Sequence, residues 1–474
     1  MSDLTVVGGG PAGLAAATAA SEAGIATTLV DEQEHLGGQY FRQPRDLDSR
    51  GDRKKKEPHG AQEIGALRNS GAEYLLKSAV YSVSPGKVDI ELPVGRRTLD
   101  SAVLIAGGAT ERVVPVPGWT LPGVVTCGAA QSMLKMHSEA VGRRVLVAGS
   151  GPFLLPVASG LIAAGAEVPR VVEAQRLGRR AVAAVCSNPE VMREAAGHLW
   201  AIASARSRLR TGWSVVRIDQ RERGLRVLLA ELDRTGAVRI GGSTEIVDCD
   251  AVCLSDGFIP SVDLGRLAGS DLRYLPGPRT WGLETRGFAG KTAADGVWAA
   301  GACVSPWSGA RLSTQMGRLA GEAAAAELLG RPVEGIGRRA ARDTAKAGRL
   351  ATRLELAFPS RAEWYERTAD DVLVCRCENV DAGTIRQAAE VSADVNAVKR
   401  MTRAGMGLCQ GRTCQASVAE LTAGVAGLSI ENVGRFSARS PDRPTTLATL
   451  AGASDGGADK DSKGKDSAPD SDGD

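Results

Sequence analysis

Histidines and aromatic residues are scarce in this chain of 474 residues. The only histidines are His35, His59, His137 and His198, and none stands at a nucleophile–base or metal-ligand spacing from a Ser, a Cys or a second His. The sequence therefore gives no support to a hydrolytic triad or a histidine-bound metal. Aromatic residues make up 4% of the chain and Gly is abundant at 58 residues, which favours Ala-, Val- and Leu-packed α/β layers over an aromatic-rich β-sandwich.

The sequence also lacks a strong charge bias and a long apolar run. A formal charge of +3 leaves no reason to expect the basic face that nucleic-acid binding requires. No stretch reaches about 18 unbroken apolar residues, because the best candidate, residues 153–168, is interrupted by Pro156, Ser159 and Gly160. Residues 1–3 lead directly into an apolar strand, without a basic-then-apolar leader. We therefore expect a cytoplasmic protein with neither a nucleic-acid nor a membrane partner.

A dinucleotide-type motif opens the chain. The apolar strand 4–7 leads into Gly8-Gly9-Gly10-Pro11-Ala12-Gly13 and an Ala-rich helix over residues 14–23. In such a motif the first glycine permits the tight turn, the second removes a Cβ that would meet a pyrophosphate, and the third lets helix and strand pack closely. Asp31 ends the next strand, residues 26–30, and is placed to bind ribose hydroxyls. The start of the chain therefore predicts a nucleotide-binding βαβ unit.

A second start of the same form follows at residues 144–173 and predicts an internal duplication. The strand 144–148 leads into Gly149-Ser150-Gly151, an apolar helix and a strand that ends in Glu173. Leu154 stands where the third glycine belongs, so the helix is held away from the strand. Glu173 suits an adenosine ribose without a 2′-phosphate. Either NAD or another adenine nucleotide binds at Gly149, Gly151 and Glu173, or the unit is retained for packing alone.

Four of the nine cysteines form a separate pattern near the C-terminus. Cys375 and Cys377 make a C-x-C pair, and Cys409 and Cys414 make a C-x4-C pair. Four thiolates can bind a [2Fe–2S] cluster or zinc, but zinc prefers C-x-x-C knuckles. The pattern favours the cluster over zinc or free thiols. Nearby glycines allow backbone N–H groups to approach the sulfurs, and nearby basic side chains offset the cluster's charge: Gly405, Gly407, Gly411, Arg376, Lys399, Arg400, Arg403 and Arg412.

The first 330 residues resemble the two-dinucleotide-domain flavoprotein reductases. Residues 37–42 are similar to the second FAD loop of that family, 105–109 to its Ala-Thr-Gly-Ala strand end, and 296–301 to its closing FAD segment. One departure is Ala302, which replaces the family's Asp. The resemblance implies that FAD binds at Gly8, Gly10, Pro11, Ala12, Gly13, Asp31, Glu32, Gly38, Gln39, Arg42, Ala106, Gly108, Gly301 and Ala302.

Residues 374–414 resemble the bacterioferritin-associated-ferredoxin (BFD) type of [2Fe–2S] domain, through both cysteine pairs and the run Lys399 to Gly407. With the run Pro117 to Thr126, the whole chain to about residue 430 resembles the α subunits of opine oxidase, D-hydroxyproline dehydrogenase and hydrogen cyanide synthase. This resemblance implies an electron-accepting subunit that works with an FAD-containing, amine-oxidase-like β subunit. An FMN between the subunits and a small ferredoxin-like third subunit are further expectations.

The predicted architecture is an α/β fold with two Rossmann-like units of the pyridine nucleotide-disulfide reductase type and a small helical BFD-like domain. A stand-alone NADH-dependent reductase and a nucleotide-binding scaffold without turnover stay open as alternative functions. The predicted segments are an FAD-binding domain (1–140 and 286–330), a second nucleotide-binding domain (141–285), a linker (331–368), a [2Fe–2S] domain (369–430) and a tail (431–474) that is disordered from about residue 452.

Overall fold

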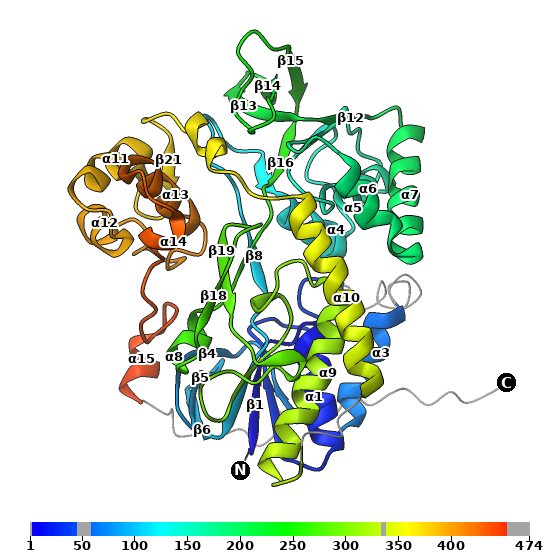
Figure 1. Cartoon of the computed structure of the whole chain (residues 1–474), viewed down its shortest axis with the longest axis vertical. Coiled ribbons are helices and arrows are strands. Elements are labelled where there is room, and N and C mark those ends of the chain that lie inside the picture. Colours follow the sequence, from blue (N-terminus) through cyan, green and yellow to red (C-terminus); the bar gives the residue numbers. More distant parts are fainter. Residues whose placement is uncertain (1, 45–57, 333–337, 453–474) are drawn as a thin grey trace, which may run out of the picture.

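The computed structural model describes residues 2–44, 58–332 and 338–452. Two α/β units lie one above the other, and a helical module packs beside them (Figure 1). The tail predicted to be disordered falls outside the described residues, except for its first position. Within the described ranges, no helix is long and apolar enough to cross a membrane.

The first unit is built on a five-stranded parallel sheet in the order β20-β7-β1-β2-β3. All four residues of β1 are buried, because helices cover one face of the sheet and an antiparallel sheet covers the other. The last strand, β20, joins the sheet from nearly 200 residues beyond β7, so the chain returns late to its first unit. The strands are β1 (Leu4–Val7), β2 (Thr27–Val30), β3 (Glu73–Leu75), β7 (Ala102–Ile105) and β20 (Val297–Ala299).

Helices α1 (Pro11–Glu22) and α9 (Gly309–Leu328) pack against each other in the first unit. A Cβ added at Gly317 would lie 2.0 Å from the carbonyl oxygen of Ala12, and one at Gly321 would lie 2.3 Å from that of Ala16. The two backbones are therefore in direct contact, which only glycine permits at these positions. Helix α1 begins at Pro11, three residues earlier than predicted, because proline suits the first turn of a helix. A third helix, α3 (Pro58–Asn69), also packs on α1.

The second unit repeats this plan, which confirms the predicted duplication. Its parallel sheet has the order β12-β11-β10-β16-β9, so β10-α5-β11 corresponds to β1-α1-β2. The strands are β9 (Val124–Thr126), β10 (Val145–Gly149), β11 (Arg170–Glu173), β12 (Arg208–Thr211) and β16 (Ala251–Ser255). The helices are α4 (Cys127–His137), α5 (Leu154–Ala163), α6 (Arg179–Cys186) and α7 (Pro189–Ser204).

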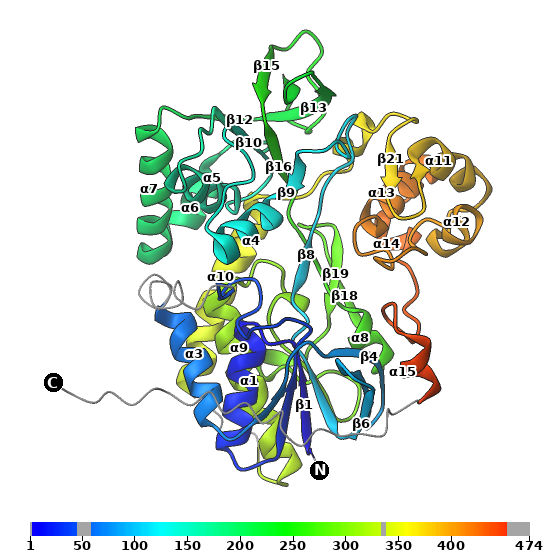
Figure 2. The same ribbon diagram turned by 180° about the vertical axis from the view of Figure 1, so that it is seen from behind.

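Antiparallel strands complete both units and connect them. Each unit carries a three-stranded sheet, β4-β5-β6 in the first and β13-β14-β15 in the second. The pair β8–β17 and the hairpin β18–β19 lie between the units (Figure 2). The bounds are β4 (Ala79–Ser84), β5 (Lys87–Glu91), β6 (Arg96–Asp100), β8 (Ala109–Glu111), β13 (Trp213–Gln220), β14 (Leu225–Glu231), β15 (Thr244–Cys249), β17 (Phe258–Pro260), β18 (Leu272–Leu275) and β19 (Thr280–Leu283), with α8 (Asp263–Leu267) after β17.

The four-cysteine module follows a helical linker. Helix α10 (Arg338–Ala357) packs on α9 and α6, and so contacts both units. Asp381 caps α11 by accepting a hydrogen bond from the Thr384 N–H at 2.8 Å, as the sequence predicts. The module consists of η4 (Ala362–Arg367), β21 (Leu373–Cys375), β22 (Val380–Asp381), α11 (Ala382–Val391), α12 (Val395–Thr402), α13 (Gln415–Ala426) and α14 (Ile430–Val433).

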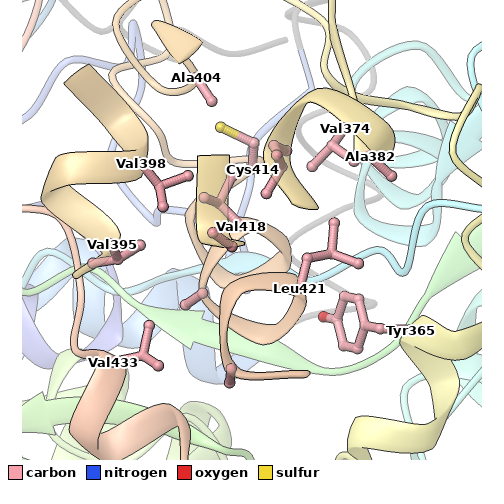
Figure 3. Close-up of a cluster of buried hydrophobic side chains, with 14 of the residues drawn as sticks. Tyr365, Val374, Ala382, Val395, Val398, Ala404, Cys414, Val418, Leu421 and Val433 are labelled. Atoms are coloured by element: carbon pink, nitrogen blue, oxygen red, sulfur yellow. The ribbon is translucent and has the colours of Figure 1, made fainter. Parts of the chain in front are cut away.

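The module has its own apolar core, which is continuous with the rest of the protein. Tyr365, Cys414, Val418 and Leu421 lie close together there (Figure 3). Val114, Ala174 and Leu232 of the two units belong to the same cluster, and so do Ile430, Val433 and Phe436 beyond the [2Fe–2S] segment. Burial of this shared apolar surface therefore holds the module against the flavoprotein-like units.

The segment after the module returns to the first unit. Its Asp442 N–H donates to the carbonyl oxygen of Tyr81 at 2.8 Å, and the Thr446 N–H donates to the Glu91 carboxylate at 3.1 Å. A short helix, α15 (Leu447–Ala451), lies beside β4 and β6 (Figure 1). The chain thus ties the module to the first unit from both of the module's ends.

Candidate cofactor sites

Three glycine-containing segments meet at the N-terminus of α1. Gly38 lies so close to Gly10 that its Cβ would come within 2.7 Å of the Gly10 Cα, and a Cβ at Gly301 would come within 2.8 Å of the Ala12 Cβ. Beside Gly10 itself the nearest atom to an added Cβ is 4.0 Å away. No side chain caps the helix, so its first-turn N–H groups are available to an anion. This arrangement fits the pyrophosphate of a dinucleotide.

Asp31 is fixed at the end of β2 by two backbone N–H groups. Its carboxylate accepts a hydrogen bond from the Gly9 N–H and another from the Gln33 N–H, the latter at 2.7 Å. Burial raises the pKa of this carboxyl, while the two hydrogen bonds act in the opposite direction. The neighbouring Glu32 points elsewhere and forms an ion pair with Arg443 of the C-terminal segment. Asp31 is therefore the better placed of the two to accept ribose hydroxyls.

The predicted second FAD loop, residues 37–42, is held by α4 of the second unit. The Lys135 ammonium donates to the carbonyl oxygens of Gln39 at 3.3 Å and Tyr40 at 2.7 Å. The Arg42 guanidinium is half-buried, and burial lowers its pKa although Asp31 and Glu32 act to raise it. Its Nε has no hydrogen-bond partner among the described residues. A buried donor of this kind fits an anionic group such as a phosphate.

The remaining predicted FAD residues follow the ends of β7 and β20. The Ala106 N–H donates to the carbonyl oxygen of Val7 at 2.9 Å, and the Gly108 carbonyl accepts from the Ser261 N–H at 3.0 Å. Gly301 has φ +83°, and Ala302 follows in the short helix η2 (Gly301–Cys303). All the segments that the resemblance assigns to FAD therefore lie at one edge of the first sheet, although Ala302 supplies no carboxylate there.

The second unit reproduces the acidic contact of the first. The Glu173 carboxylate accepts hydrogen bonds from the Gly151 N–H and the Gln175 N–H, both at 2.8 Å. Burial raises the pKa of Glu173 to about 7, against the lowering effect of these bonds. The environment of Gly151 differs from that of Gly10, however, because a Cβ added at Gly151 would lie 2.9 Å from the ring of Trp307. The two dinucleotide-type turns thus have the same form but different surroundings.

The structure brings the four C-terminal cysteines together as two pairs. Cys375 is hydrogen-bonded to Cys414, and Cys377 to Cys409, with electrostatic coupling across the pairs. Cys375 and Cys414 are buried, Cys409 is half-buried and Cys377 is exposed. The described residues contain no group of three or more His, Cys, Asp or Glu side chains spaced for one metal ion. The paired thiols are a donor set that suits a [2Fe–2S] cluster.

Electrostatics around the buried cysteine pair favour a thiolate. The pKa of Cys375 is lowered to about 5, chiefly by the hydrogen bond from the Cys414 thiol and then by backbone N–H groups, despite its burial. One of these donors is the Gly405 N–H, 3.4 Å from the Cys375 sulfur. Gly407 instead permits close contact with Cys377, since an added Cβ would lie 2.4 Å from the Cys377 Cβ. Gly411 packs against the ring of Phe436.

The basic residues near the cysteines each have a second partner in the structure. Arg376 stacks over the ring of Trp119 and Lys399 over that of Phe436, at 5.5 and 4.8 Å from the ring centroids. Arg403 pairs with Glu378, Arg412 with Asp442 and Arg400 with Asp394. Their positive charges are therefore held in fixed positions around the cysteine pairs.

Several residues of the central junction have no motif that reveals them in the sequence. Arg112, with 1% of its surface exposed, donates to the Ser360 hydroxyl at 2.5 Å and to the Arg279 carbonyl oxygen at 3.0 Å. Arg279 in turn pairs with Glu420 of α13. These contacts join residues 140–250 positions apart in the chain. A fully buried arginine has no local sequence signal, so sequence reasoning missed the network.

Comparison with known proteins agrees with this geometry. The chain belongs to the pyridine nucleotide-disulphide oxidoreductase family, whose model matches residues 2–324, and residues 373–423 match the BFD-like [2Fe-2S] binding domain. More particularly, it belongs with one of the subunits of opine oxidase. The opine oxidase chain from Agrobacterium tumefaciens (strain Ach5) is 30% identical over 477 residues, which cover 95% of this chain and 91% of the relative.

Two further proteins support this placement. Hydrogen cyanide synthase subunit HcnB of Pseudomonas aeruginosa is 31% identical, with 86% of this chain and 90% of the relative covered. The crystal structure of L-proline dehydrogenase from P. horikoshii shares the fold, with a TM-score of 0.64 and 19% identity over 95% of this chain and 79% of that chain. The predicted family and fold class are confirmed. The chain is an FAD-dependent oxidoreductase with a [2Fe–2S] domain.

Proposed function

We propose that this chain is the electron-accepting α subunit of a heteromeric dehydrogenase that oxidises an amino acid, an opine or a D-hydroxyproline-type amine. A separate FAD-containing, amine-oxidase-like β subunit would supply the substrate site. The related opine oxidase and hydrogen cyanide synthase chains are named as subunits, which supports a heteromeric enzyme. An FMN at the interface and a small ferredoxin-like third subunit belong to the same proposal.

The observation that carries the proposal is the combination of two cofactor sites in one connected body. FAD exchanges electrons in pairs and a [2Fe–2S] cluster carries them singly, so a chain holding both can pass electrons from one kind of donor to another. The chain's own residues hold the sites in place. The cysteine module shares its apolar core with both units, and the Arg112–Ser360 and Arg279–Glu420 contacts tie it to the junction between them.

Specific residues are expected to bind and orient the flavin. The N-terminus of α1 and the Arg42 guanidinium would hold the pyrophosphate, since both offer donors without a side-chain cap or partner. Asp31 would accept the ribose hydroxyls from its fixed position at the end of β2. In the cysteine module, Cys375, Cys377, Cys409 and Cys414 would hold the irons.

The proposal can be tested on the complex from its native cells. A tagged chain is purified without oxygen, its co-purifying polypeptides are identified, and a panel of opines and secondary amino acids is added to the complex and to the separated chain. We expect one class of substrate to bleach the flavin of the complex but not that of the separated chain. Reduction of the separated chain by substrate alone would contradict the proposal.

A further inference from the structure

Trp307 and residues 358–361 lie in the place where a nucleotide would enter the second dinucleotide unit. We infer that these residues exclude NAD(H) and other adenine nucleotides, and that the second unit serves instead to anchor the segment leading into the cysteine module. The inference rests on the proposed function for its consequence: a chain that cannot bind NADH must receive its electrons from a partner. The exclusion itself stands on the geometry of the second unit.

The first argument concerns the glycine turn. In a dinucleotide site the second glycine lies against the pyrophosphate, so the space beside its Cα must be open. That space is open at Gly10, where the nearest atom to an added Cβ is 4.0 Å away. At the corresponding Gly151 the Trp307 ring fills it, with Cη2 at 2.9 Å and Cζ3 at 3.5 Å. An indole ring therefore occupies the position of the phosphates.

The second argument concerns the edge of the sheet beyond Glu173. There the Gln175 side chain donates to the carbonyl oxygen of Pro359 at 2.6 Å. The Arg361 guanidinium approaches the Gln175 side-chain oxygen at 3.3 and 3.4 Å and donates to the Thr235 carbonyl at 3.1 Å. Residues that would border an adenosine are thus already hydrogen-bonded to the chain itself.

The third argument is how little space remains. Phe358 stacks on Trp307, with ring centroids 6.2 Å apart, and the Ser360 N–H donates to the Gly277 carbonyl at 2.8 Å. The cavity between these residues and Ser150 measures about 220 Å³. Small-molecule sites generally measure roughly 300–1,000 Å³, and a dinucleotide needs a large one. The remaining space is too small for NAD.

The same segment explains what the second unit does. Residues 358–361 lead directly into η4, where Trp364 and Tyr365 are buried in the core of the cysteine module. Arg361 also fills the space beside Gly236, since an added Cβ there would lie 2.5 Å from its Cδ. The nucleotide edge of the second unit thus holds the start of the module. This attachment fixes the module relative to the first unit.

Hydrogen–deuterium exchange of the FAD-loaded chain tests the exclusion directly. NADH, NAD⁺ or ADP is added at millimolar concentration, and exchange is followed in peptides covering residues 149–154 and 358–361. We expect less than a twofold change in either peptide, and no saturable heat in a matched calorimetric titration. Saturable binding together with slower exchange at residues 149–154 would overturn the inference.

A pair of variants tests the anchoring role. Phe358→Ala removes the ring that stacks on Trp307, whereas Leu356→Ala changes a side chain two positions earlier that is 57% exposed. We expect Phe358→Ala to speed exchange at residues 149–154 by about tenfold, corresponding to about 1.4 kcal/mol, and Leu356→Ala to leave it unchanged. Equal exchange in the two variants would overturn the anchoring. If Phe358→Ala does not fold, Arg361→Ala provides the same comparison.

These outcomes are separate from those of the proposed function. Nucleotide binding in a chain whose flavin is still reduced only in the complex would overturn the inference and leave the proposed function standing. A chain that binds no nucleotide but is reduced by amino-acid substrate without a partner would do the reverse. Bleaching of the flavin by NADH at a catalytically useful rate would contradict both.

Discussion

Arg279 and Glu420 form a two-pronged ion pair between the β18–β19 hairpin and helix α13. The Arg279 Nε and Nη2 each donate to a separate oxygen of the Glu420 carboxylate at 2.7 Å, and the Glu420 side chain is 1% exposed. Both charges are satisfied only when the cysteine module is seated on the two units. The pair therefore links the placement of the module to the stability of the whole chain.

The two partners of this pair differ in burial, so their loss should differ in cost. Arg279→Met leaves a buried, unpaired carboxylate and should lower the free energy of unfolding by about 3–5 kcal/mol. Glu420→Gln leaves an arginine that is 25% exposed and should cost less. Urea unfolding measures both, with Arg217→Met at the exposed Arg217–Asp219 pair as the control, expected within about 0.5 kcal/mol of the parent. A larger loss for Glu420→Gln than for Arg279→Met would contradict the account.

The contact between α1 and α9 should not tolerate a methyl group. In Gly317→Ala the new Cβ would overlap the Ala12 carbonyl oxygen, so α1 must shift and stability should fall by about 1–3 kcal/mol. Because Ala12 is in the first turn of α1, flavin retention should fall as well. Gly197→Ala in α7 meets nothing within 4 Å and should instead gain about 0.5–1 kcal/mol. Thermal unfolding and released flavin, measured on both variants, decide the matter.

Removal of one cysteine should separate the two cofactors. Cys375→Ser and Cys414→Ser should each lose the iron and acid-labile sulfide while keeping FAD, because the flavin residues lie in the first unit. Cys186→Ser, at an exposed cysteine outside the module, is the matched control and should keep both. Iron, sulfide and flavin are assayed on the same preparations. Full iron content in Cys375→Ser would exclude that residue as a ligand.

Glu173 should make stability fall as the pH rises. Its folded pKa of about 7 lies above the unfolded value of 4.5, so its stabilising contribution is fully present below pH 4.5 and is lost as the pH rises through about 7. Between pH 5 and pH 8 the parent should lose about 2 kcal/mol relative to Glu173→Gln, which does not ionise. Urea midpoints of the two proteins at both pH values give this double difference. A constant difference across that range would show that Glu173 ionises freely in the fold.

The sequence predicts the local parts of this structure well. Helix α11 and its Asp381 cap have the expected bounds, because capping and periodicity are properties of neighbouring residues. Both βαβ units follow from their glycine turns in the same way. The grouping of cysteines was also predictable, since only four of the nine have a ligand-like spacing.

The long-range packing could not be predicted in this way. Nothing near Trp307 in the sequence indicates that its ring lies on Gly151, more than 150 positions earlier. Gly317 and Gly321 look like ordinary helix glycines until α9 is placed against α1. Arg112 is buried only because three distant segments supply its partners. Each of these features depends on how the elements pack, which a single sequence does not encode locally.

The most direct test of the central claim is one anaerobic reductive titration of the chain, prepared from iron-replete, oxygen-free cultures. Flavin absorbance and the cluster's paramagnetic resonance signal are followed while dithionite is added, and then in a parallel sample with NADH. The account predicts that dithionite reduces both a stoichiometric FAD and the [2Fe–2S] cluster, and that NADH reduces neither. A colourless chain without flavin and acid-labile sulfide, or one whose flavin NADH bleaches, would contradict it.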